Sequence, residues 1–485
     1  MSDGGCDESH WIVMKYGGSS VATVDAWQTI AHVVTQRVAA GHSVMLVCSA
    51  VKSATNMLHE MVHAARTGKE TTRHLCRFES LHRQLADELG LCFEDVLGME
   101  LKELEQSLKQ LTAQPCESDL APRIMATGEF CSTKLGYGFL QGQLEEVAWL
   151  DARDILRVRE TDASPHHGLA VECDYQRDNQ LIANLSALAP VVMTQGYIAG
   201  DVDGTTRLLG RGGSDTSAAY LAAKLGAACL EIWTDVPGVF TANPNWVHDA
   251  RLIRHLSYQE AESMARLGTK VLHPRSLEPV RKAQIPLHIR WTEQPQLQGT
   301  LIDGDPTTRT SATEIRSVAA REDMLLFRSK PEEQIGSWIT KLDAAMGHPV
   351  QWESVNYCEG GLRATLDPQL HALEKWDTRQ RMDRANDLDH VVLLDDVTSV
   401  SLVGKGLDRL YHEIGPALSV FGTERVHHVD HHCDGTRLTW VVDGHDTEEL
   451  VRGLHRILLE TAGETASLGP SWRELKTTAD YGVAV

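Results

Sequence analysis

Short runs of β-branched and apolar residues alternate with longer stretches of helical spacing over the first 300 residues. This alternation constrains the fold most, because strands that are separated by helices pair in parallel within one sheet. The runs that predict buried strands are Trp11–Tyr16, Ser43–Cys48, Pro190–Gln195 and Cys229–Thr234. The helical patterns lie at Val24–Ala40, in several segments between residues 56 and 112, and at Ala218–Gly226. We therefore predict an α/β domain with a central, mostly parallel sheet.

The pattern changes after Thr292, where polar residues, glycines and prolines become frequent, and we place a domain boundary near residue 300. Beyond it, two successive sets of patterns, each about 70 residues long, predict a duplicated regulatory module of βαββ type. The first set comprises a strand pattern at Ile315–Phe327, a helix pattern at Glu332–Ala345 and a strand pattern at Val350–Leu366. The second set lies at Thr398–Leu402, Leu407–Val420, Val426–Val442 and Thr447–Leu459.

Composition limits the partners of the chain. The formal net charge of -21 argues against a nucleic acid, because such a surface repels phosphate backbones. A run of about 18 apolar residues is missing, so we predict no membrane partner. The polar, acidic first ten residues do not resemble a secretory signal, and ten cysteines without a CxxC pair fit reduced thiols. These features predict a cytoplasmic protein.

A cluster of histidines near the carboxyl end is open to two interpretations. Residues 427–433 contain four histidines, one aspartate and one cysteine, which are common metal ligands. Alternation along a strand would send neighbouring side chains to opposite faces, which favours an exposed strand or hairpin and no metal.

The loop Gly210–Asp215, GRGGSD, is the strongest candidate for a binding site. Its three glycines let the backbone approach a ligand closely, and Ser214 and Asp215 stand where a helix begins. Arg211 adds a planar fork that grips a carboxylate in two places. A helix cap with a flexible lead-in is the simpler interpretation, but it does not account for Arg, Ser and Asp together.

Other segments offer charges for a phosphorylated ligand. Lys15 ends a strand just before Gly17 and Gly18, an arrangement that holds phosphate oxygens although it is not a Walker A loop. Nucleotides bind at the loops that follow strands of α/β sheets, so residues 234–245, which follow a predicted strand, are a candidate nucleotide site. Glu129 is a lone acid in a small, apolar helical segment, and a buried acid needs a partner such as an ammonium group.

Taken in this order, these segments resemble aspartokinases, which are members of the amino-acid kinase family. The similarity covers nearly all of residues 11–292, and its most specific motifs are SAVKSATN at 49–56, GRGGSDTSA at 210–218 and TDVPGVFTANP at 234–244. The nearest similarity is to forms that are sometimes fused to a diaminopimelate decarboxylase. SVSLVGKGL at 399–407 resembles the paired ACT domains of aspartokinases.

The resemblance implies an amino-acid-kinase sandwich at residues 1–300 followed by two βαββαβ (ACT-like) domains at 310–395 and 396–465. The segment 466–485 would complete the first ACT-like domain, with residues from Trp472 onward returning as a strand. ACT-like domains imply a homodimer or a higher homo-oligomer and an amino-acid effector. A role in dimerisation alone is the simpler alternative.

The resemblance also implies residue roles. Lys15 would contact the transferred phosphate, and Asp215 would orient the side chain of Lys15. The substrate side would comprise Arg211 on the α-carboxylate, Glu129 on the α-ammonium, and Ser49, Ala50, Thr55 and Ser214. ATP, with Mg²⁺, would lie against Gly17, Gly18, Ser19, Thr234, Asp235, Phe240 and Lys270. Phe240 replaces the usual Tyr of the family, and Asn243 and Asn245 replace an acid and an Arg, which puts the support of ATP in doubt.

The implied activity is ATP-dependent phosphorylation of the side-chain carboxylate of L-aspartate, the first step of aspartate-family amino-acid biosynthesis. No general base is required, because this carboxylate, with a reference pKa of about 3.9, is already ionised at neutral pH. Two alternatives stay open: a kinase of another amino-acid carboxylate, and an amino-acid sensor with little catalysis. Intact Lys15, Arg211 and Asp215 count against the sensor.

Overall fold

The fold is given by a computed structural model of the chain. It describes residues 10–159, 169–267, 272–304, 313–330, 333–346, 350, 352–358, 361–368, 391–444, 446–460 and 468–481. None of the described helices has the length and the apolar character that crossing a bilayer requires.

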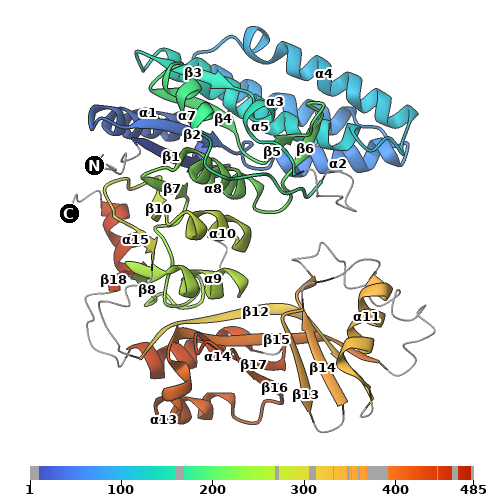
Figure 1. Cartoon of the computed structure of the whole chain (residues 1–485), viewed down its shortest axis with the longest axis vertical. Helices are drawn as coiled ribbons and strands as arrows, with labels where there is room; N and C mark the ends of the chain where they lie inside the picture. The colour runs from blue at the N-terminus through green and yellow to red at the C-terminus, as the bar shows by residue number, and fades with distance from the viewer. Residues whose placement is uncertain are drawn as a thin grey trace, which may run out of the picture. The chain divides into compact units, whose positions relative to one another are not determined.

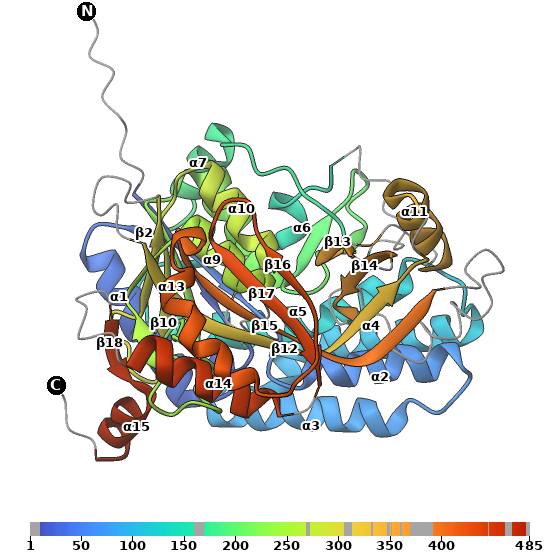
Figure 2. The same cartoon turned by 90° about the horizontal axis from the view of Figure 1, so that it is seen from below.

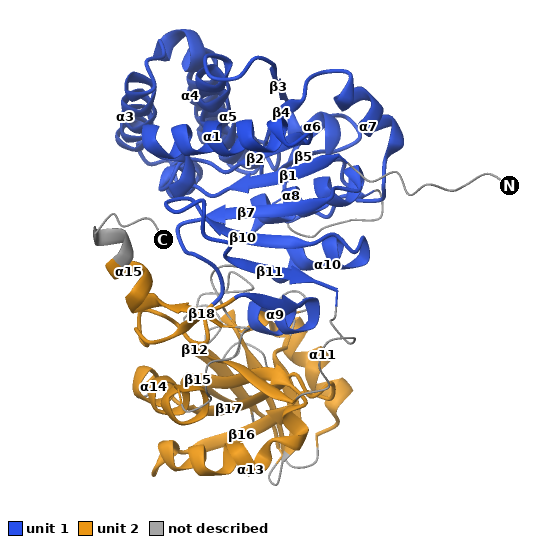
Figure 3. Ribbon diagram, turned by 90° about the vertical axis from the view of Figure 1, so that its left-hand side faces the viewer, with its two compact units in different colours: residues 1–239, 254–265, 270–306 blue, residues 240–253, 266–269, 307–485 orange. Residues whose placement is uncertain are grey.

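The chain divides into two compact units (Figure 3). Unit 1 comprises Met1–Val239, Arg254–Ala265 and Lys270–Pro306, and unit 2 comprises Phe240–Ile253, Arg266–Thr269 and Thr307–Val485. The stretch Phe240–Ile253, which we placed in the first domain, therefore belongs to unit 2. The predicted limits of the ACT-like domains stay predictions.

Unit 1 is built on an eight-stranded sheet, and Figure 1 labels most of its strands. The strands, in spatial order, are β3 (Val147–Leu150), β4 (Val191–Gln195), β2 (Ser43–Cys48), β1 (Trp11–Tyr16), β7 (Cys229–Thr234), β10 (Leu287–Trp291), β11 (Thr300–Asp303) and β9 (His255–Ser257). The first six are paired in parallel, and only β10 and β11 run antiparallel. The predicted central, mostly parallel sheet is confirmed.

Helices cover this sheet, and two short strands, β5 (Ile198–Gly200) and β6 (Thr206–Leu208), form a separate hairpin. The helices of unit 1 are α1 (Val24–Ala39), α2 (Ala54–Arg66), α3 (Thr72–Glu88), α4 (Phe93–Ala113), α5 (Leu120–Gln141), α6 (Ala152–Ile155), α7 (Asn179–Ser186), α8 (Gly213–Leu225), α9 (Tyr258–Arg266, whose last residue falls in unit 2) and α10 (Pro274–Lys282). The short 3₁₀ turn η1 (Ser19–Val21) follows β1.

The alternation of side chains along β1 decides which helices cover which face. Met14 and Tyr16 are fully buried in one large core together with Trp27 of α1 and apolar residues of α5. Successive residues of a strand point to opposite faces, so Lys15 points the other way, and it reaches α8 there. One face of β1 therefore lies in this core, and the other face, where Val13 is also buried, carries the charge of Lys15.

Unit 2 contains a six-stranded antiparallel sheet (Figure 2). In spatial order its strands are β13 (Ser354–Cys358), β14 (Gly361–Leu366), β12 (Glu314–Arg328), β15 (Val392–Lys405), β17 (Arg437–Asp443) and β16 (Val426–His431). Its helical elements include α11 (Ile335–Met346), η4 (Leu407–Arg409), α13 (Tyr411–Ile414), η5 (Gly415–Phe421), α14 (Thr447–His455) and η6 (Arg456–Glu460). The pattern at Val350–Leu366 predicted a single strand, but it forms the antiparallel pair β13 and β14.

The carboxyl end corrects one prediction. Strand β18 (Leu468–Ser471) pairs with β8 (Arg251–Ile253), and the residues from Trp472 form helix α15 (Trp472–Tyr481) instead of a returning strand. The helix starts with a capping box, in which Ser471 N donates to Glu474 Oε2 at 2.7 Å and Glu474 N donates to Ser471 Oγ at 3.3 Å. This local cap ends the strand at Ser471.

The histidine cluster lies on β16 and just after it. His427 Nε2 donates to Asp443 Oδ1 at 2.6 Å, because Arg328 donates to the other ring nitrogen. The neighbouring His428 bonds to Ser354 Oγ at 2.9 Å. Within the described ranges, no three His, Cys, Asp or Glu side chains gather as metal ligands would.

Candidate active site

Four parallel strands of unit 1 end at the same edge of the sheet, and their following loops meet there. After β1, β2, β4 and β7 the chain continues with Gly17, Ser49, Gly196 and Asp235. Backbone bonds tie these loops together: Ser49 N donates to Tyr16 O at 3.1 Å, and Gly196 N donates to Cys48 O at 2.9 Å. The carboxyl edge of a parallel sheet is the usual place for a ligand in this type of fold.

The structure brings Lys15 and Asp215 together. Lys15 Nζ lies 2.6 Å from Asp215 Oδ1, although 200 residues separate them, and their side chains are only 11% and 18% exposed. Lys15 comes from the end of β1 and Asp215 from the first turn of α8. The ion pair holds the ammonium group beside the turn after β1, where a Cβ on Gly17 would lie 3.7 Å from Lys15 Nζ.

The glycine-rich loop is shaped by close contacts. Gly212 has a φ of +66°, and a Cβ placed on it would lie 2.4 Å from His273 Cγ. A Cβ on Gly196 would lie 2.6 Å from Ser214 Cβ. Side chains at these positions would displace the loop, which explains the glycines. Helix α8 begins at Gly213, five residues before the predicted start, so Ser214 and Asp215 lie inside its first turn.

Arg211 stands at the tip of this loop and is exposed. Within the described part of the chain it makes no ion pair and no hydrogen bond, and its guanidinium group is therefore available to an anion. This availability is what a carboxylate-binding role requires.

Glu129 of α5 is the most unusual group at this edge. Glu129 is 3% exposed, and its Oε2 has no hydrogen-bond partner among the described residues. Burial raises the pKa of this carboxyl to about 8, although the backbone N–H of Ala50 acts in the opposite direction. A buried carboxyl without a cation is ready to receive one.

The predicted substrate segment at 49–56 lies between Glu129 and the loop after β1. Ser132 Oγ donates to Ser49 O at 2.7 Å, which ties the segment to α5. Lys52 N donates to Gly18 O at 3.0 Å, and a Cβ on Gly18 would lie 2.7 Å from Ala50 O. Thr55 is in the first turn of α2. The predicted substrate and phosphate segments are thus adjacent.

The predicted nucleotide residues are only partly brought together. Gly17 N donates to Trp233 O at 3.2 Å, which places the Gly17–Ser19 turn beside the end of β7, where Thr234 and Asp235 follow. Phe240 belongs to unit 2, where its ring meets that of Trp472 edge-on at 5.7 Å between centroids. Lys270 lies outside the described residues.

Two residues at this edge were not predicted. His273 caps α10, packs against Gly212, and has its pKa lowered to about 4, mainly by burial and then by Arg275, so the ring is neutral at pH 7. Tyr197 follows Gly196 directly and packs against Gly213. The only sequence signals were His-Pro at the start of a helix and Gly-Tyr after a strand.

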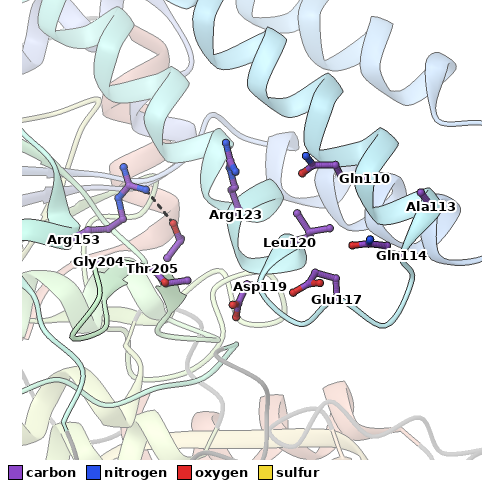
Figure 4. A pocket seen from close by; sticks show the side chains of 11 residues that line it. Gln110, Ala113, Gln114, Glu117, Asp119, Leu120, Arg123, Arg153, Gly204 and Thr205 are labelled. Carbon is purple, nitrogen blue, oxygen red and sulfur yellow. Dashed lines mark hydrogen bonds between the residues drawn. The ribbon is translucent and has the colours of Figure 1, made fainter.

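A separate pocket of about 560 Å³ lies elsewhere in unit 1 (Figure 4). It is bounded by the end of α4, the start of α5 and the β5–β6 hairpin, and Arg153 donates to Thr206 Oγ1 there at 3.2 Å. Leu120 and Arg123 face it from a side of α5 that differs from that of Glu129. None of the predicted site residues lines this pocket.

The fold and the arrangement of the strand ends agree with the comparison to known families. The chain belongs to the amino acid kinase family, which matches residues 10–290. It is 28% identical to lysine-sensitive aspartokinase 3 of Escherichia coli (strain K12), over 93% of this chain and 100% of that protein.

Solved structures give the same result. E. coli aspartokinase III in complex with aspartate and ADP matches with a TM-score of 0.77 and 25% identity, and its complex with lysine and aspartate matches with a TM-score of 0.71 and 27% identity. Both comparisons cover 93% of this chain and 100% of the other.

Proposed function

We propose that this protein is an aspartate kinase, which transfers the terminal phosphoryl group of ATP to the side-chain carboxylate of L-aspartate and forms 4-phospho-L-aspartate. The observation that carries the proposal is Glu129, a buried carboxyl whose Oε2 has no hydrogen-bond partner among the described residues, at the edge where Lys15 is fixed by Asp215. An amino acid supplies the ammonium group that Glu129 lacks. The similarity to aspartokinases over 93% of the chain supports aspartate as that amino acid.

The mechanism depends on charge. The aspartate side chain is already an anionic nucleophile, so the protein does not need to remove a proton. It must instead bring this anion close to a polyanionic phosphate. Lys15, oriented by Asp215, stabilises the charge that develops on the transferred group, while Arg211 and Ser214 hold the α-carboxylate end of the substrate.

The nucleotide lies with its phosphates over Gly17, Gly18 and Ser19, beside Thr234 and Asp235. Mg²⁺ enters with ATP, because this ion is usually held by phosphate oxygens, waters and only one or two carboxylates. The exposed Asp235 can provide one carboxylate, since Asp215 is engaged by Lys15. When bound, Mg²⁺ offsets phosphate charge. The roles of Phe240 and Lys270 at the nucleotide are part of this proposal.

Unit 2 is the proposed regulatory part, with the predicted ACT-like domains mediating homo-oligomer formation. The lysine sensitivity that gives the E. coli relative its name favours lysine as the effector. The cytoplasmic location and the place of the reaction as the first step of aspartate-family amino-acid biosynthesis stay predictions.

A hydroxylamine-trapping assay tests the activity. With ATP, Mg²⁺ and single amino acids, we expect an acyl hydroxamate with aspartate and none with glutamate or N-acetylglutamate. Lys15→Ala should reduce the signal by about 100-fold or more, because it removes a charge that acts on the transferred group. Lys69→Ala, which removes an exposed lysine beyond the end of α2, is the matched control and should keep full activity.

The other outcomes separate the alternatives. Hydroxamate with a different amino acid would identify a kinase of another carboxylate. A well-folded protein that forms no hydroxamate but binds amino acids would support the sensor instead.

A further inference from the structure

The predicted nucleotide segment, residues 234–245, continues from unit 1 into unit 2. It begins at the end of β7 and crosses the boundary between Val239 and Phe240. Within unit 2, Phe240 forms a bridge to Leu252 of β8, and its ring meets that of Trp472 edge-on. The position of this end of the segment therefore depends on the contacts that unit 2 makes with it.

Thr241, the residue after Phe240, is 1% exposed and is held through both its backbone and its side chain. Its N donates to Arg251 O at 3.0 Å, and its O accepts from Val318 N of β12 at 2.8 Å. Its Oγ1 accepts from Arg251 N at 2.9 Å and lies 2.8 Å from Nε2 of His455, the last residue of α14. Thr241 thus joins the segment to the sheet and to a helix of unit 2.

The ring of His455 is oriented from its other side by Glu460. His455 is 2% exposed, and its Nδ1 lies 3.4 Å from Glu460 Oε1. The two residues are five positions apart, and the π-helical turn η6 brings positions at this spacing together. The carboxylate attracts a proton to Nδ1, so that Nε2 accepts the hydroxyl proton of Thr241. Burial lowers the pKa of His455, and its ring is therefore neutral at pH 7, as this arrangement requires.

We propose that His455 is a positioning residue for the nucleotide: by holding Thr241, it fixes the backbone of Phe240, which is proposed to lie against ATP. The inference deepens the proposed function and rests on it. It assigns to α14, in the proposed regulatory part of the chain (orange in Figure 3), an effect on nucleotide affinity. The simpler role for this buried bond is to stabilise unit 2, and that role predicts no change in the binding of ATP.

His455→Leu tests the proposal, because leucine fills the buried site but cannot accept from Thr241. We expect the KM for ATP, and the Kd for ADP measured by calorimetry, to rise about 3- to 10-fold, since one buried hydrogen bond is lost. The KM for aspartate should not change. His455→Gln, whose amide oxygen can still accept, should restore most of the affinity. Thr241→Val removes the same bond from its other side, and combining it with His455→Leu should add little further.

Thr447→Val is the matched control. Thr447 is at the start of the same helix, and its Oγ1 makes a buried bond of 3.1 Å to Thr398 Oγ1 of β15. Its loss should lower the melting temperature but leave the Kd for ADP unchanged. An unchanged Kd for ADP in both His455→Leu and Thr241→Val would overturn the proposal, as would an equal rise of that Kd in Thr447→Val. A failure of the proposed function would appear separately, as wild-type protein that binds ADP but forms no aspartyl hydroxamate.

Discussion

The sequence predicted that Glu129 is a buried acid, but it could not predict the residues that surround its carboxyl group. The sequence marked it as a lone acid in an apolar segment, and the structure confirms that it is buried, with no cation paired to it among the described residues. Its hydrogen-bond donor Ala50 comes from another part of the chain, so its electrostatic environment depends on tertiary structure. Its raised pKa is therefore a property of the fold.

This pKa predicts how aspartate binding depends on pH. With a pKa of about 8, Glu129 is mostly protonated at neutral pH, and it must ionise to bind an ammonium group. We expect the KM for aspartate to fall as pH rises from about 6.5 towards about 8 and then to level off. Initial rates at saturating ATP across this range measure the effect. Glu129→Gln should raise the KM at least about tenfold and remove this dependence.

Stability gives an independent measurement of the same group. The pKa of Glu129 in the folded state is raised from 4.5 to about 8. Its contribution to the free energy of unfolding is therefore fully present below about pH 4.5 and is lost as the pH rises through about 8. As the pH rises from about 4.5 to about 8, the melting temperature of unliganded Glu129→Gln should therefore fall less than that of the wild type.

A wild-type KM for aspartate that is constant from pH 6.5 to 8.5 would contradict the assignment of Glu129 to the substrate ammonium group.

The contacts of the other site residues could be predicted from the sequence to different extents. The proximity of Lys15 to Asp215 was expected only through the resemblance, because no local pattern joins residues 200 positions apart. His273 and Tyr197 were missed because their importance comes from contacts with Gly212 and Gly213, which the fold alone creates.

At the scale of elements, buried strands were the most predictable features. The predicted limits of β1, β2 and β7 agree with the structure, because a continuous apolar run bounded by polar residues defines a strand that is covered on both faces. The helical pattern at Ala218–Gly226 begins later than α8, since Gly-Ser-Asp is a poor helix former in isolation, whereas the placement of Ser214 and Asp215 where a helix begins agrees with the structure. Tertiary contacts with the ends of β1 and β4 start the helix earlier.

Gly212, in the loop before α8, allows the cost of backbone strain to be separated from the cost of a steric clash with His273. Gly41 and Gly212 both have positive φ, but a Cβ on Gly41 would meet nothing within 4 Å, whereas one on Gly212 would meet His273. Gly41→Ala should lower the free energy of unfolding by about 1 kcal/mol, from backbone strain alone. Gly212→Ala should lower it by about 2 kcal/mol more, because the ring of His273 must move.

Kinetics distinguishes the two variants further. Gly212→Ala should raise the KM for aspartate more than that for ATP, since Arg211 and Ser214 flank the substitution, and Gly41→Ala should change neither. Equal melting temperatures and equal KM values for the two variants would show that His273 does not restrain the loop.

At the scale of the whole molecule, the presence of a second, largely antiparallel unit was predictable, but its strand order was not. The pairing of β12 with both β14 and β15 joins residues that are up to about 90 positions apart in the two predicted repeats. The final segment was misassigned because a short strand followed by a helix resembles many other elements until its partner, β8, is known.

At the scale of the whole molecule, we predict which amino acid regulates the activity. We expect millimolar lysine to lower the initial rate, and threonine to have little effect, because the full-length E. coli relative is lysine-sensitive. Titrating each amino acid, singly and together, at aspartate concentrations near KM measures the response. No response to either would favour a role of unit 2 in assembly alone.

Strand β1 has a further consequence for how this chain can change over time. Its register against β2 and β7 fixes which side chains enter the core and which one meets α8. Inserting or deleting one residue before Lys15 would turn Met14 or Tyr16 towards α8 and push the ammonium group into an apolar core. Length variation in this strand is therefore excluded, and its sequence can drift only by substitutions that keep the two faces distinct.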